Sequence, residues 1–298
     1  MDTTAIPPGT IVVGVDGSAS SARALDWAID HAVREHRPLS LAHAIDPTAA
    51  ARIAAGGADP TAVQEALRSD ANATVARARS RVAERASELV VLELTSPSDP
   101  RVLLLDLAKQ AALVVVGSRG RGPLASLLLG SVGAAVARQA TCPVVVVRPG
   151  NPGVVRNGVL VGIDGTEQSL VPLEFAYRQA SLRRLPLTVM HCFGETGSGQ
   201  LDDEVRLTVA ETLSGLGEKF PEVRARVELA GGAVDGALVR ASHRMDVVVL
   251  GAHHGSALGS VMAGSVAISV LEHASCPVAI VPTTMASTGN GGPRHEHR

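Results

Sequence analysis

A glycine-rich segment with an anion-binding pattern lies near the middle of the sequence. Residues 113–133, LVVVGSRGRGPLASLLLGSVG, read as a buried strand, a glycine-rich loop and the start of a helix. Glycine lets a backbone approach a bulky ligand, and the free N–H groups at a helix N-terminus favour an anion such as phosphate. The residues expected to admit a nucleotide, hold its phosphates or neutralise its charge are Gly117, Gly120, Gly130, Ser131, Arg119 and Arg121.

Two well-known phosphate-binding motifs are absent from the sequence, so the glycine-rich segment belongs to neither of these two types. The sequence contains no GxxxxGK[ST], and neither of its lysines, Lys109 and Lys219, lies near a glycine loop. No GxGxxG occurs in the first strand-to-helix turn, so the dinucleotide fingerprint is also missing. The remaining alternative is a tight turn whose glycines serve packing and bind no ligand.

A carboxylate follows the first expected strand, TIVVGV at 10–15. Asp16 would accept hydrogen bonds from an amino group or a ribose hydroxyl, or it would cap the helix that follows. In a parallel sheet, ligands bind at the carboxyl ends of the strands, where the strand order reverses. Asp16 and the glycine loop are therefore expected to share one cleft.

Both motifs occur twice, which predicts two similar domains. VVVLGAHHGSALGSVMAGSVA at 247–267 repeats the glycine segment 134 residues later, and VLVGIDGT repeats IVVGVDGS 148 residues later. The matching site positions in the second copy are Asp164, Gly251, Gly264 and Ser265. His254 replaces Gly120, so its ring would crowd a phosphate, unless His253 and His254 donate to the phosphate themselves. The sequence therefore does not decide whether the second copy binds a nucleotide.

The sequence offers little support for a catalytic site or a metal site. His43 and His191 occupy matching positions after the second strand of each copy and are expected to be packed and hydrogen-bonded. No GxSxG, HExxH or zinc-spaced cluster occurs, so no catalytic or metal-binding residue is assigned. The three cysteines, Cys142, Cys192 and Cys276, are expected to be small buried residues of a reducing compartment.

Composition favours a globular α/β protein. Hydrophobic residues make up 46% and aromatic residues only 2%, so the core must be aliphatic, as in buried parallel strands. A net charge of -2 and the scarcity of aromatic platforms argue against a nucleic-acid partner. There is no signal peptide and no apolar run near the ~20 residues that span a bilayer, so a cytoplasmic location is expected.

Strand and helix signals alternate in each copy, which predicts two tandem five-stranded parallel sheets with helices on both faces. Strands are expected at 10–15, 39–45, 89–94, 113–117 and 143–149, then at 158–163, 186–192, 223–229, 246–250 and 277–281. Helices are expected at 20–36, 62–88, 99–111 and 130–140, then at 167–184, 202–219, 233–243 and 264–274. Residues 46–62, rich in Ala, Gly and Pro, are expected to form a loop. The expected organisation is a domain at 1–150, a linker at 151–157, a domain at 158–284 and a disordered tail at 285–298.

These motifs together carry a resemblance to a known family. The pattern G-x2-G-x9-G-[ST] between an apolar strand and CPVVVV, with IVVGVDGS and VLVGIDGT, resembles the universal stress protein family over nearly the whole chain. The resemblance implies a Rossmann-like, adenine nucleotide α-hydrolase-like fold with strand order 3-2-1-4-5, and ATP binding by members with the glycine motif. It implies that the adenine or ribose meets Val15, Asp16 and Ala44, and that the phosphates meet Gly117, Gly120, Gly130 and Ser131 with Val132 nearby.

The family resemblance also bears on assembly and function. It implies antiparallel pairing of the last strands, PVVVVRP and PVAIVP, within the chain or between the chains of a homodimer. Three functions are then in competition. The first is an ATP-dependent regulator of stress or dormancy responses. The second is a slow Mg²⁺-dependent ATPase or phosphotransferase, for which only Asp16 and Asp164 are candidate carboxylates near the clefts. The third is a scaffold that binds no nucleotide.

Overall fold

The structure is a computed structural model that describes residues 6–120, 129–149, 154–156, 158–193, 213–252 and 258–283. The expected disordered tail at 285–298 lies outside the described residues, and only 154–156 of the expected linker are described. We call residues 6–149 the first half and residues 154–283 the second half.

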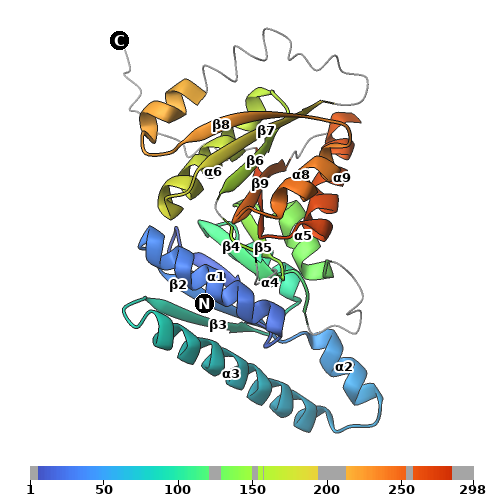
Figure 1. The fold of residues 1–298 in the computed structure, drawn as a ribbon. Coiled ribbons are helices and arrows are strands. Elements are labelled where there is room, and N and C mark those ends of the chain that lie inside the picture. Colours follow the sequence, from blue (N-terminus) through green and yellow to red (C-terminus); the bar gives the residue numbers. More distant parts are fainter. Residues whose placement is uncertain are drawn as a thin grey trace, which may run out of the picture.

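Within these ranges ten strands form a single sheet, shown in Figure 1. The strands of the first half are β1 (Ile11–Gly14), β2 (Leu39–Ala44), β3 (Val91–Ser96), β4 (Leu113–Gly117) and β5 (Val144–Val147). Those of the second half are β6 (Val159–Ile163), β7 (Leu187–Phe193), β8 (Ala225–Gly231), β9 (Val247–Ala252) and β10 (Val278–Pro282). The strand order is β3-β2-β1-β4-β5-β10-β9-β6-β7-β8, so each half is parallel with the implied order 3-2-1-4-5. The predicted α/β fold is confirmed.

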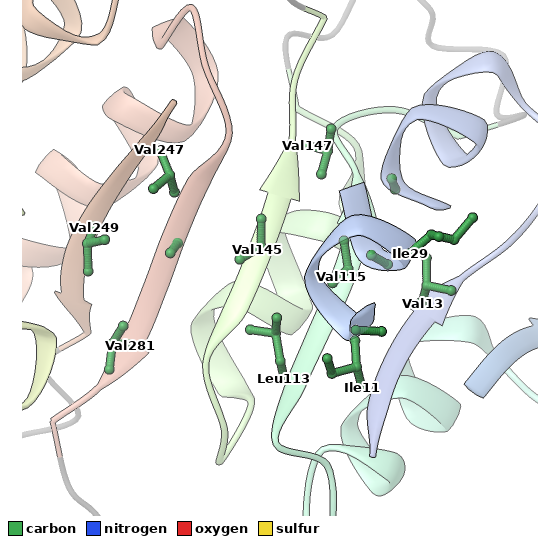
Figure 2. Close-up of a cluster of buried hydrophobic side chains, with 14 of the residues drawn as sticks. Ile11, Val13, Ile29, Leu113, Val115, Val145, Val147, Val247, Val249 and Val281 are labelled. Carbon is green, nitrogen blue, oxygen red and sulfur yellow. The ribbon is translucent and has the colours of Figure 1, made fainter. Parts of the chain in front are cut away.

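The two halves join edge to edge through their last strands. β5 and β10 run antiparallel, with Val146 opposite Val278 and Val144 opposite Ile280. The two expected sheets are therefore one continuous sheet whose strand direction changes at this junction. In Figure 2, Val145 and Val147 on β5 and Val281 on β10 belong to one buried aliphatic cluster that crosses the junction.

Helices cover both faces of the sheet, as the alternating pattern predicts. One face packs against α1 (Ala19–Glu35), α3 (Pro60–Arg85) and α6 (Leu170–Arg183). The other packs against α4 (Pro100–Leu107), α5 (Ser131–Gln139), α8 (Val234–Ser242) and α9 (Leu258–His273). Strand residues alternate between the two cores, so Ile11 and Val13 face the first group while Val12 faces the second. Both faces of the central strands are buried, which explains their nearly continuous aliphatic sequences, whereas the outermost strands β3 and β8 are partly exposed.

The expected loop at 46–62 is wrong over much of its length, because Pro47–Ala55 forms the helix α2. The Asp46 carboxylate accepts the Thr48 N–H at 2.8 Å, and Pro47 occupies the first turn, where its missing N–H has no cost. The alanines that follow have the highest helix propensity, and this outweighs the loop-like composition of the segment. The same Asp-Pro start opens α3 and α4.

Across the described residues, every helix is too short or too polar to cross a membrane.

Candidate functional site

The first half places its two motifs at one edge of the sheet. β1 pairs with β2 on one side and β4 on the other, so the connections that follow β1 and β4 diverge. This is the position at which open α/β sheets bind ligands. Val15 and Asp16 follow β1 directly, Ala44 ends β2, and Gly117 ends β4. The Val15 N–H donates to the Ala42 carbonyl at 2.9 Å and fixes this edge.

The Asp16 carboxylate does not cap α1. Ser18 is the N-cap, and its hydroxyl oxygen accepts the Ser21 N–H at 3.1 Å. Asp16 Oδ1 accepts the Ser18 N–H at 2.9 Å across Gly17, whose φ of 77° is the left-handed conformation that glycine tolerates. The capping alternative for Asp16 is therefore wrong, and its carboxylate is held at the start of the turn.

The glycine loop packs directly against this carboxylate. A Cβ atom at Gly120 would lie 2.9 Å from Asp16 Oδ2, closer than real Cβ atoms approach an oxygen. Gly120 is exposed, and its lack of a side chain allows the loop to approach the carboxylate this closely. The structure thus brings together the two motifs that the sequence assigned to one cleft.

Gly117 has a different role from Gly120. A Cβ atom there would lie 2.6 Å from Ser20 Oγ and 2.7 and 2.8 Å from the carbonyl carbon and oxygen of Ser20. The Arg119 N–H also donates to Ser20 Oγ at 3.2 Å. Gly117 therefore allows the end of β4 to pack on the first turn of α1, which is the packing alternative for this glycine. Sequence reasoning missed Ser20 in this role, and the only signal was the serine-rich run after Asp16.

The helix after the glycine loop begins as the anion-binding pattern requires. Gly130 is the N-cap of α5, and among the described residues no side chain caps the helix. The Gly130 N–H donates to the Ser118 carbonyl at 2.8 Å, which ties the helix start to the loop. Ser131 is exposed and Val132 is half-buried in the first helical turn. The uncapped first-turn N–H groups and the helix dipole favour an anion at this position.

Among the described residues, Arg119 offers a candidate cation beside this helix start. The Arg119 side chain is exposed. Burial, together with the nearby charge of Arg119, lowers the pKa of Arg148, which follows β5. Arg121 lies outside the described residues, as does the whole segment 121–128.

The second half repeats the carboxylate but not the helix start. Asp164 follows β6, and its Oδ1 accepts the Thr166 N–H at 3.0 Å, the Thr166 hydroxyl at 2.7 Å and the Ser169 hydroxyl at 2.6 Å. Gly251 lies in β9, while Gly264 and Ser265 lie inside α9. The sequence predicted that this helix begins at 264, but it begins at Leu258, so Ser265 is not at its N-terminus. His254 lies outside the described residues, as does His253.

His43 has a hydrogen-bond partner, and burial shifts the pKa values of His191, Cys142 and Cys276. His43 Nδ1 lies 2.6 Å from the Val15 carbonyl oxygen, so the predicted packed, hydrogen-bonded histidine is confirmed at this position. His191 lies opposite Ile163 in the same register, and burial lowers its pKa. Burial raises the pKa of Cys142 and of Cys276 to about 12, which keeps both thiols protonated at neutral pH.

The described residues of the first half fit an anionic nucleotide. The fit rests on the side-chain-free position at Gly120 beside the Asp16 carboxylate and on the uncapped start of α5. In the part of the chain that the structure describes, no three His, Cys, Asp or Glu side chains gather as a metal site.

Comparison with known proteins gives the family context. The family model described as "Universal stress protein family" matches residues 8–148 and again 156–282. A universal stress protein of Mycolicibacterium smegmatis is 33% identical over 287 residues, covering 91% of this chain and 96% of that protein. A universal stress protein of Mycobacterium tuberculosis (strain H37Rv) is 32% identical over 284 residues, with coverage of 91% and 96%.

A solved structure agrees with the fold. The crystal structure of a universal stress protein from Archaeoglobus fulgidus superposes with a TM-score of 0.70 at 18% sequence identity. The superposition covers 93% of this chain and 97% of that one. At this identity the likeness supports the fold alone.

Proposed function

The chain belongs to the universal stress protein family in both halves, and on that basis we propose that it binds ATP in the cleft of its first half. Family membership supports a role in stress responses. The finer role that we propose is regulation of stress or dormancy responses, in which ATP occupancy changes the shape or the partners of the protein.

One observation carries this proposal. The Asp16 carboxylate lies against Gly120, at the edge where β1 and β4 end and beside the uncapped start of α5. A nucleotide needs an acceptor for its amino or hydroxyl groups at one end and an anion site at the other. These residues offer both at one edge of the sheet.

The proposed binding mode assigns each group a part. The adenine or ribose lies along Val15, Asp16 and Ala44, at the ends of β1 and β2. The phosphates lie over Gly120, Gly130 and the first-turn N–H groups of α5, at Ser131 and Val132. The exposed Arg119 guanidinium neutralises phosphate charge.

A binding role is preferred to phosphoryl transfer. Such transfer requires carboxylates that hold Mg²⁺ and a positioned nucleophile. Among the described residues at the first cleft, the carboxylate that we assign is Asp16, which already accepts the Ser18 N–H. A cytoplasmic location and any role for Mg²⁺ remain predictions from the sequence.

The test is to denature the protein as purified and to measure the released nucleotide per chain by ion-pair chromatography. We expect about one ATP per chain, together with a rise in Tm when ATP is added to nucleotide-free protein. About two per chain would mean that the second half is also competent. No nucleotide and no shift in Tm would overturn the proposal in favour of a scaffold.

A further inference from the structure

The two halves meet at a second place besides the β5–β10 junction. α1 and α6, which occupy equivalent positions in the two halves, cover the same face of the sheet on either side of the junction (Figure 1). Both helices end at a residue with left-handed conformation, His36 with φ 52° and Arg184 with φ 55°. We call the contact between Trp27–Glu35 of α1 and Arg178–Arg183 of α6 the helix seam.

The helix seam is held by an ion pair with a buried carboxylate. The Glu35 side chain is only 7% exposed. Its Oε1 lies 3.1 Å from Arg178 Nε, and its Oε2 accepts Arg178 Nη2 at 3.2 Å. This two-point geometry between guanidinium and carboxylate is the strong form of the interaction. Arg37 of the first half also donates to Glu35, at 2.8 Å.

A second arginine of α6 faces α1 across the same seam. The Arg183 guanidinium carbon lies 4.9 Å from the centroid of the Trp27 ring, a cation–π arrangement. Burial lowers the pKa of Arg183 to about 10, while the nearby carboxylates of Asp30 and Glu35 act in the opposite direction. A further hydrogen bond across the seam has its donor on α1 and its acceptor on α6, since Arg34 donates to the Leu182 carbonyl at 3.4 Å.

The charges of the seam are reversed between the halves. The 148-residue offset that aligns Asp16 with Asp164 also aligns Asp30 with Arg178 and Glu35 with Arg183. At both positions the first half carries an acid and the second half carries an arginine. The repeat is therefore similar in fold but opposite in charge where its two copies touch.

The strand junction by itself cannot tell one half from the other. β5 is Val144–Val147, and it meets an aliphatic stretch of β10 through backbone hydrogen bonds. Such a ladder depends little on sequence, so β5 of one chain is equally able to pair with β5 of another. Discrimination must come from side chains beside the junction.

We propose that the helix seam is a specificity surface, on which α1 of the first half accepts the arginine-bearing α6 of a second half and rejects another α1. If two first halves met in the same geometry, Asp30 of each copy would face Glu35 of the other copy. If two second halves met, Arg178 and Arg183 would face each other. Like charges held close at a partly desolvated contact are strongly unfavourable. Arg37 stays beside Glu35 in every pairing and so does not select a partner.

Charge reversal in the full-length chain tests this proposal. Glu35→Arg and Arg178→Glu each place like charges across the seam, and the double variant restores an opposite pair in the reverse sense. We expect each single variant to lose about 4–8 °C in Tm and to gain mass with concentration in light scattering, as β5 and β10 edges are released. The double variant should regain the mass of the wild type and the part of the lost Tm that comes from the pair with Arg178, while the loss of the Glu35–Arg37 bond persists in it.

The control is Glu93→Arg, which reverses a charge in an exposed pair with Arg79 on β3 and α3, away from the seam. It should leave both the mass and the Tm close to those of the wild type. Single variants that behave like this control would overturn the proposal. So would a double variant whose defects equal the sum of the single defects, because the two side chains would then not act on each other.

Discussion

The two candidate clefts share a motif but differ in how the chain is built around it. In the first half, α5 begins at Ser131, directly after Gly130, so the repeated spacing of the motif ends at a helix N-terminus. In the second half, α9 begins at Leu258, and Ser265 has helical residues before it. A serine inside a helix has its N–H bonded within the helix, and this N–H is no longer offered to an anion.

The carboxylates differ as well. Among the described residues, Asp16 Oδ1 accepts the Ser18 N–H, and its Oδ2 faces the glycine loop. Asp164 Oδ1 accepts three local donors from Thr166 and Ser169, which serve the turn before α6. A repeated motif therefore preserves the turn after the strand more faithfully than it preserves the ligand site.

The largest effect that we expect concerns Gly117, where the loop of the first half meets α1. In Gly117→Ala, the new methyl would collide with the Ser20 backbone, which cannot move aside as a side-chain end can. Overpacking of this kind costs about 2–3 kcal/mol of the free energy of unfolding, measured by urea denaturation. Gly215→Ala is the control, since no atom outside its chain neighbours and its own helix backbone lies within 4 Å of the added Cβ. Equal stability of the two variants would contradict the packing role of Gly117.

A second prediction compares the two carboxylates directly. Asp16→Asn should weaken ATP binding about 100-fold, because the lost charge-assisted bonds are worth about 2.7 kcal/mol. Asp164→Asn should change the affinity less than about twofold, since its acceptor oxygen is committed to Thr166 and Ser169. Isothermal titration calorimetry on nucleotide-free protein gives both affinities. Equal losses for the two variants would mean that the second cleft binds ATP as well.

Features of the fold that depend on local sequence patterns could be predicted more fully than features that depend on contacts between distant residues. The buried strands could be predicted, because β1, β4 and β5 are short aliphatic runs and the repeat is plain, and their order was implied by the family resemblance. α2 was missed because Ala-, Gly- and Pro-rich composition hid an Asp-Pro helix start. The early start of α9 was missed because the glycines of the second copy resemble those of the first.

Individual side-chain contacts between distant segments were beyond the sequence. The approach of Ser20 to Gly117 joins the first helical turn of α1 to the end of β4, and no local pattern signals it. The reversed charges of α1 and α6 are visible once the repeats are aligned. Their meeting across the seam follows only from the antiparallel junction of β5 and β10.

A third prediction uses the seam position where the halves carry His31 and Gln179. Burial, and then the nearby charges of Arg183 and Arg178, lower the pKa of His31 to about 3, while Glu35 lies 3.5 Å away. The unfolded chain titrates near pH 6.5 and binds more protons between these values, so stability falls as the pH falls through this window. At pH 5 the loss is about 2 kcal/mol relative to neutral pH.

His31→Gln installs the residue that the second half already uses, and it should remove this pH dependence. Urea denaturation of the wild type and the variant at pH 7 and pH 5 isolates the contribution, because the other titrating groups are common to both proteins. A wild type and a variant that lose the same stability on acidification would show that His31 is protonated in the folded state.

The smallest effect expected is also the most direct test of the first cleft. In Gly120→Ala, the Cβ atom at 2.9 Å would push Asp16 Oδ2 aside, and ATP affinity should fall about tenfold, which is ~1.4 kcal/mol. Stability should change by less than ~0.5 kcal/mol, because Gly120 is exposed and the displaced atom ends a side chain. In the Asp16→Asn background the further loss should shrink, since the methyl acts through the carboxylate. A full tenfold loss in that background would instead place the methyl against the nucleotide itself.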